Sequence, residues 1–132
     1  MKVRILLADD FPAFTDLVER LLDPVFDVVG RVSDGESLVT AAQKLNPDVI
    51  ITDISMPILS GIDAIRKLRQ VGSRAEVMFL TIHSGADFVR LCVAVGAKAY
   101  VVKSEVENEL LPALGEMLAG RNFISSAAES TK

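Results

Sequence analysis

The chain of 132 residues has no tryptophan, a single tyrosine and a single cysteine. One cysteine cannot form an intramolecular disulfide, so we expect Cys92 to be a small buried side chain in a fold without such crosslinks. No apolar run approaches the ~20 residues that a membrane-spanning helix requires, so we expect no association with a membrane. Met1 and Lys2 lead directly into an apolar stretch without the pattern of a signal peptide, and we therefore expect a cytoplasmic protein.

Clustered positive charge is also missing. The 14 Lys and Arg residues are outnumbered by 18 Asp and Glu residues, which gives a formal net charge of −4 and leaves no long basic run. Direct binding to nucleic acid normally needs a basic face, so we do not expect this chain itself to bind DNA. What is abundant is aliphatic: half of the residues are hydrophobic and only 5% are aromatic. The length and composition therefore predict one domain with an aliphatic core.

Apolar stretches typical of buried strands alternate five times with stretches of helical spacing. We predict strands at residues 3–8, 25–32, 49–51, 77–80 and 99–102, and helices at 11–22, 35–45, from 61 onward, 86–95 and 106–119. This alternation is typical of an α/β fold in which helices cover both faces of a parallel sheet. We therefore predict a doubly wound, five-stranded parallel sheet of the (βα)5 type.

Polar residues stand where these predicted strands end. Asp9 and Asp10 follow the first strand, Asp53 the third, Thr81 the fourth and Lys103 the fifth. The carboxyl ends of parallel strands converge on one crevice, and the flavodoxin-like strand order 2-1-3-4-5 would bring the three carboxylates together there. Each Asp alone could simply cap the loop that follows it. Together, clustered carboxylates favour a hard divalent cation, and a nearby lysine suits a phosphoryl group accepted by a nucleophilic Asp53.

These residues resemble a known family. The pair Asp9 and Asp10, the segment Thr52-Asp53-Ile54-Ser55-Met56-Pro57 with Gly61, and then Thr81, Tyr100 and Lys103 are similar to the motifs of bacterial response regulator receiver domains, the CheY-like superfamily. The resemblance covers residues 3–120. Residues 8–12, 102–104 and 119–125 are most similar to the NarL/FixJ (LuxR-type) subfamily. The resemblance implies a receiver domain at residues 1–121 and a tail or linker at 122–132, leading to a helix-turn-helix output domain outside this chain.

The resemblance also implies the chemistry of the site. Asp53 would accept a phosphoryl group from a sensor histidine kinase. Mg²⁺ would be the cofactor, held by Asp9, Asp10, Asp53 and the backbone carbonyl of Ser55, in keeping with its preference for a few carboxylates and water. The chain would catalyse only its own phosphotransfer and dephosphorylation, and would otherwise not be an enzyme.

The resemblance further implies a switch. Lys103 would pair with the phosphoryl oxygens, and Thr81 would donate its hydroxyl to one of them. As Thr81 moves, Tyr100 would rotate inward and reshape the surface formed by the fourth helix, the fifth strand and the fifth helix. That change would control a homodimer or an output domain, and through the output domain the transcription of genes.

Three positions depart from the commonest family pattern. Ser104 follows the lysine where many receivers have a proline, so whether the Lys103-Ser104 peptide is cis is left open. Ser55 and His83 lie two residues after Asp53 and Thr81, where family side chains flank the phosphoryl group and tune its lifetime. We expect His83 on an exposed loop, where it modulates access of water. A lone histidine without a partner histidine or cysteine is a poor transition-metal ligand.

Other functions are weighed against this one. A stand-alone receiver could act by protein–protein contacts without DNA. An aspartate-phosphoenzyme hydrolase of the haloacid-dehalogenase type would have an Asp where Ser55 stands. A flavin- or dinucleotide-binding protein would carry a glycine-rich loop after the first strand, which this sequence does not have. A degenerate receiver that never takes phosphate is disfavoured because the carboxylates, the threonine and the lysine are all present.

Overall fold

A computed structural model describes residues 1–129, in which strands and helices alternate along the chain. The strands are β1 (Arg4–Ala8), β2 (Asp27–Val32), β3 (Val49–Thr52), β4 (Glu76–Thr81), β5 (Ala99–Val102) and β6 (Phe123–Ile124). The helices are α1 (Pro12–Leu22), α2 (Gly35–Leu45), α3 (Gly61–Gln70), α4 (Ala86–Ala94), α5 (Val106–Leu118) and α6 (Ser126–Glu129), with a 3₁₀ turn η1 at Lys103–Glu105. Among residues 1–129, no helix is long and apolar enough to cross a bilayer.

The strands form one parallel sheet in the order β2-β1-β3-β4-β5-β6. The predicted parallel α/β architecture is confirmed, and the first five strands have the predicted order. The predicted number of five strands is wrong, because Phe123 and Ile124 pair with Ala99 and Tyr100 and add a sixth strand beside β5. Two residues are too few to show the alternation by which a strand is found in a sequence.

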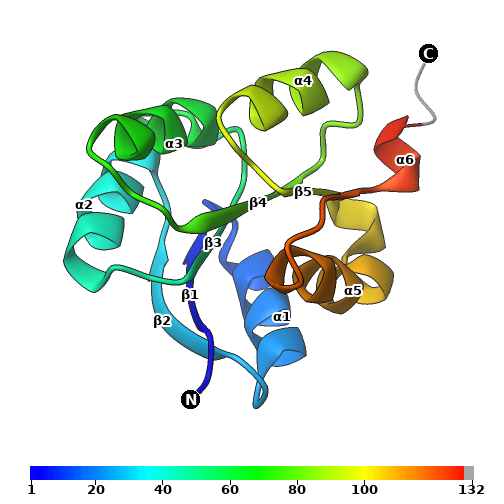
Figure 1. The fold of residues 1–132 in the computed structure, drawn as a ribbon, viewed down its shortest axis with the longest axis horizontal. Helices are drawn as coiled ribbons and strands as arrows, with labels where there is room; N and C mark the ends of the chain where they lie inside the picture. Colours follow the sequence, from blue (N-terminus) through cyan, green and yellow to red (C-terminus); the bar gives the residue numbers. More distant parts are fainter. Residues whose placement is uncertain (130–132) are drawn as a thin grey trace.

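Helices cover both faces of the sheet (Figure 1). On one face, aliphatic residues of α1 and α5 such as Val18, Leu22 and Leu114 pack against the strands. On the other, α2, α3 and α4 contribute a second buried cluster that includes Leu38, Ile65 and Cys92. Cys92 is fully buried, and burial raises the pKa of its thiol to about 12, so it is an inert packing group. Two aliphatic layers thus hold the strands rigidly, with their carboxyl ends at one edge.

The tail expected at residues 122–132 differs from the structure over its described part. Strand β6 extends the sheet, and α6 packs against α4 and β5. Ser125 and Ala128 are fully buried. Residues 123–129 therefore belong to the folded domain, while residues 130–132 lie outside the described part of the chain. Among residues 1–129 the cis peptide bond is Asp23–Pro24, so the Lys103–Ser104 peptide is trans.

The loop between β3 and α3 packs closely on the start of α2. Asp34 caps α2 by accepting a hydrogen bond from the amide of Ser37 at 2.7 Å. At the next residue, Gly35, a Cβ atom would lie 2.0 Å from the carbonyl oxygen of Leu59. No side chain fits at this approach, so glycine lets the loop settle against the helix. This contact fixes the loop that follows Asp53.

We predict opposite effects of alanine at two glycines. Gly35→Ala should lower the free energy of unfolding by about 2 kcal/mol, because backbone must move to admit the methyl group. Gly115→Ala should raise it by about 1 kcal/mol, because Gly115 lies inside α5 and no atom of the described residues beyond its own helix turn lies within 4 Å of the added Cβ. Urea unfolding of both variants measures the difference, and effects of the same sign would contradict this packing.

Candidate functional site

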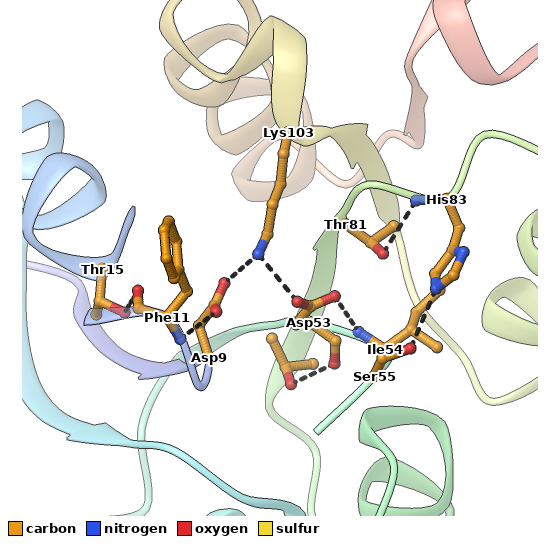
Figure 2. Close-up of polar contacts among 10 residues, drawn as sticks. Asp9, Phe11, Thr15, Asp53, Ile54, Ser55, Thr81, His83 and Lys103 are labelled. Carbon is orange, nitrogen blue, oxygen red and sulfur yellow. Dashed lines mark hydrogen bonds and ion pairs between the residues drawn. The ribbon is translucent and has the colours of Figure 1, made fainter. Parts of the chain in front are cut away.

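Four side chains from three strand ends meet at the carboxyl edge of the sheet. Asp9 and Asp10 follow β1, Asp53 follows β3, and Lys103 follows β5. The Lys103 Nζ lies 2.7 Å from Asp9 Oδ2 and 2.9 Å from Asp53 Oδ2, as Figure 2 shows. The side chains of Lys103, Asp9 and Asp53 are each at most 13% exposed to solvent. The lysine therefore joins two buried carboxylates that are 44 positions apart in the sequence.

Asp10 completes an acidic cluster. One carboxylate oxygen from each of Asp9, Asp10 and Asp53 lies within 4.8 Å of the others. Asp9 and Asp53 are buried, whereas Asp10 is exposed to solvent. Three oxygen donors of this kind, open to water on one side, fit a small hard cation that keeps part of its hydration shell. The backbone carbonyl of Ser55 as a further ligand stays a prediction.

Both oxygens of Asp53 are held. Oδ1 accepts a hydrogen bond from the amide of Ile54 at 2.7 Å, and Oδ2 accepts one from Lys103. The Asp53 amide donates to the carbonyl of Ala8 at 2.9 Å, which ties the end of β3 to β1. A Cβ at Gly61 would lie 1.9 Å from the Asp53 carbonyl oxygen, so this glycine lets α3 start directly against the acidic residue. Asp53 is thus a buried carboxylate with a fixed orientation.

The charges in this cluster depend on one another. Burial raises the pKa of Asp9, and its hydrogen bonds with Lys103 and the amide of Phe11 offset that only in part. Burial alone would lower the pKa of Lys103, but its bonds to Asp9 and Asp53 outweigh this and raise that pKa. The lysine therefore carries a full positive charge at neutral pH.

Phe14 is a site residue that the sequence did not reveal. The Lys103 Nζ lies 4.6 Å from the centroid of the Phe14 ring, within the range of a cation–π interaction. Helical spacing assigns Phe14 to the core face of α1, and nothing in that spacing shows that this face also meets the lysine. The Phe14 ring therefore limits the positions that the Lys103 ammonium can take.

Beside Asp53, a second group of residues is linked through His83. The His83 amide donates to Thr81 Oγ1 at 3.3 Å, and the His83 carbonyl accepts the Tyr100 hydroxyl at 2.7 Å. The His83 Nε2 lies 3.1 Å from Ser55 Oγ (Figure 2). His83, expected on an exposed loop, is half-buried because its ring stacks on Phe88 with centroids 4.2 Å apart. Phe88 is the second residue that sequence patterns missed.

Tyr100 lies inward in the structure. Its side chain is 1% exposed, and burial raises the pKa of its hydroxyl group. Thr81 is also fully buried, on the neighbouring strand β4, where it pairs with Val102 while Phe79 pairs with Tyr100. The structure therefore shows the inward position that was expected to follow a rotation, and the rotation itself stays a prediction.

The space around these residues is small. The hollow beneath Asp9 and Asp53 has a volume of about 10 Å³. That is about the room that a single water molecule needs, and too little for an organic substrate. The reacting group must therefore approach from the open side of the carboxylates.

Comparison with known proteins agrees with this geometry. Residues 5–115 match the response regulator receiver domain. The chain belongs to this family. It is 35% identical over 125 residues to the transcriptional regulatory protein DegU of Brevibacillus brevis, which covers 93% of this chain and 53% of DegU. It is 32% identical over 125 residues to the nitrate/nitrite response regulator protein NarL of Escherichia coli (strain K12), covering 93% and 58%.

A solved structure is similar over almost the whole receiver. The two-component response regulator of the LuxR family from Aurantimonas sp. SI85-9A1 superimposes with a TM-score of 0.91 at 31% identity, covering 98% of this chain and 94% of that one. The expected NarL/FixJ-type receiver is thereby confirmed, and the relatives are regulators rather than haloacid-dehalogenase-type hydrolases. The receiver spans little more than half the length of DegU and NarL.

The position of Lys103 leads to a stability prediction. Lys103→Met should cost about 3 kcal/mol of unfolding free energy in a chelating buffer, because two buried carboxylates lose their counter-charge. Added Mg²⁺ should restore part of that loss by mass action. Thermal and urea unfolding with and without Mg²⁺ measure both effects.

Lys98→Met is the matched control. Lys98 pairs with Glu76 at 3.2 Å, but both side chains are about one-third exposed. Such a pair contributes at most about 1 kcal/mol. Equal losses in the two variants would show that burial of the acidic cluster does not depend on Lys103.

Proposed function

We propose that this receiver accepts a phosphoryl group on Asp53 from a sensor histidine kinase. The observation that carries the proposal is Lys103, which bridges Asp53 and Asp9 beside the exposed Asp10. A carboxylate oxygen of Asp53 attacks the phosphorus of the phosphohistidine, the phosphorus–nitrogen bond breaks, and the imidazole leaves. The ammonium of Lys103 lies close enough to Asp53 to pair with the phosphoryl oxygens as they arrive.

Asp9, Asp10 and Asp53 would hold Mg²⁺, with the Ser55 carbonyl as a fourth protein ligand. The close grouping of their oxygens supports this assignment. When bound, the ion offsets the negative charge that a phosphoryl group adds to a site that is already acidic. Phe11, whose amide is bonded to Asp9 and whose side chain is exposed, flanks the open side.

Thr81 and Tyr100 would carry the signal from the site. The Thr81 hydroxyl accepts a bond from the His83 amide, and a hydroxyl that accepts one bond still has a proton to donate to a phosphoryl oxygen. Tyr100 is connected to the same loop through the His83 carbonyl. Ser55 and His83, linked to each other beside Asp53 (Figure 2), would regulate how water reaches the phosphoryl group.

The output would be control of transcription in the cytoplasm. The names of DegU and NarL, together with their greater length, support a DNA-binding domain that follows the receiver, reached through a linker and regulated by phosphorylation or dimerisation. DNA would be contacted only by that domain. A stand-alone receiver acting by protein–protein contacts is the alternative.

Phosphorylation has a direct test. With Mg²⁺ and acetyl phosphate, the chain should gain the mass of one phosphoryl group, and Asp53→Asn should gain none, since an amide oxygen is a far weaker nucleophile. Asp63→Asn is the control, because Asp63 is an exposed acid on α3 paired with Arg66. Intact-protein mass spectrometry gives the answer, and modification that persists in Asp53→Asn would sink the assignment.

The metal assignment has a separate test. In chelator, Asp10→Asn should raise the unfolding free energy by on the order of 0.5 kcal/mol, because one of three like charges is removed. The stabilisation that Mg²⁺ gives the unsubstituted chain should disappear in this variant and persist in Asp63→Asn. Thermal unfolding over a Mg²⁺ titration measures it, and an unchanged Mg²⁺ response in Asp10→Asn would count against the assigned ligands.

A further inference from the structure

Residues 123–129, here called the C-terminal segment, dock beside the switch residue. Strand β6 pairs with β5 so that Ile124 stands opposite Tyr100. The amide of Phe123 donates to the Lys98 carbonyl at 2.9 Å, and the amide of Ser125 donates to the Tyr100 carbonyl at 2.7 Å. Figure 1 shows α6 next to the end of β5 at the edge of the sheet. The backbone of Tyr100 is thus bonded directly to this segment.

The segment also closes the surface over the Tyr100 side chain. Ala128 is fully buried in the same apolar cluster as Tyr100 and Cys92, and Ile124 packs against that cluster. The space left between Tyr100, α4 and Ile124 is a hollow of about 20 Å³. A phenol ring cannot turn into so small a hollow, because close-packed atoms on every side would have to move first.

On its inner side, Tyr100 is held by a different contact. Its hydroxyl donates to the His83 carbonyl, in the loop whose amide is bonded to Thr81. The ring therefore lies between the phosphoacceptor site on one side and the C-terminal segment on the other. An outward ring would need the space that Ile124 and Ala128 occupy.

The docking is of a kind that can be reversed. Phe123 and Ile124 are half-buried, and the fully buried side chains of residues 123–128, Ser125 and Ala128, are small. Among residues 1–129, the buried Ser125 hydroxyl oxygen has no hydrogen-bond partner, which opposes docking. Few large contacts and one unsatisfied polar group are typical of segments that open locally at low cost.

We infer that the C-terminal segment is an intramolecular lock that holds Tyr100 inward, so that docking of the segment and phosphorylation of Asp53 stabilise each other. The second half of this inference rests on the proposed function. Coupling between two sites is reciprocal, so a docked segment raises the affinity for a phosphoryl group by the same factor by which that group favours docking. The surface formed by α4 and the edge of β5 is thus occupied by the chain itself when Tyr100 is inward.

Tyr100 reports on the lock without any labelling, because the chain has one tyrosine and no tryptophan. Ala128→Asp places a charge in a fully buried position, whereas Ser126→Asp places it in an exposed position of the same short helix. Without any phosphodonor, acrylamide should quench Tyr100 fluorescence about twofold more strongly in Ala128→Asp, since the released ring populates exposed positions. Quenching in Ser126→Asp should equal that of the unsubstituted chain.

The coupling is measured with beryllofluoride and Mg²⁺, which mimic the phosphoryl group. Ala128→Asp should bind beryllofluoride about fivefold more weakly than Ser126→Asp, near the lower end of typical coupling between sites. In the unsubstituted chain, the amides of Phe123 and Ser125 should exchange hydrogen more slowly once beryllofluoride is bound. This exchange measurement decides whether the segment and the phosphoryl site are coupled even where Ala128→Asp does not fold.

The outcomes separate the two claims. A folded Ala128→Asp chain with unchanged Tyr100 quenching overturns the lock. Exchange at Phe123 and Ser125 that stays equal or becomes faster with beryllofluoride overturns the coupling. If the unsubstituted chain binds no beryllofluoride, the proposed function and the coupling both fail, while the quenching comparison still decides whether the segment holds Tyr100.

Discussion

The site depends on one buried cation. Lys103 is the only positive group seen to bond Asp9 and Asp53 among the described residues, and it does so with little exposure to water. Without that charge, two carboxylates at neighbouring strand ends would repel each other and would be expensive to bury. The lysine sets their separation and leaves the exposed Asp10 to face solvent. Under the proposed function, a phosphoryl group on Asp53 would bring its negative charge next to this lysine, so the contact that stabilises the fold would also recognise the ligand.

The fold makes this arrangement possible because it holds the backbone around Asp53 in a fixed position. The Asp53 amide is bonded to β1, and Gly61 brings α3 against the Asp53 carbonyl. Since both faces of the sheet are packed with aliphatic residues, the strand ends cannot shift to relieve repulsion in the acidic cluster. The repulsion is therefore offset locally by Lys103, or in the proposed function by a bound Mg²⁺, and not by movement of the sheet.

Much of the architecture was predictable from the sequence because strand ends carry a strong signal. Five apolar stretches with helices between them define a parallel sheet, and Asp9, Asp53 and Lys103 fall at its carboxyl edge for that reason alone. Phe14 and Phe88 were not predictable as site residues, because helical spacing separates core from surface but does not say which loop residue a ring will meet. The strand at Phe123 and Ile124 was missed because two residues show no period, and its pairing is decided by the free edge of β5.

That free edge also explains why the C-terminal segment packs where it does. A parallel sheet ending at β5 would expose unpaired backbone groups at Lys98 and Tyr100, and β6 satisfies them with the amides of Phe123 and Ser125. The same pairing carries Ala128 over the cluster that contains Tyr100. Docking of the C-terminal segment therefore both pairs the free edge of β5 and covers Tyr100. Any partner that binds this edge must compete with the segment, and any change that turns Tyr100 outward must first remove it.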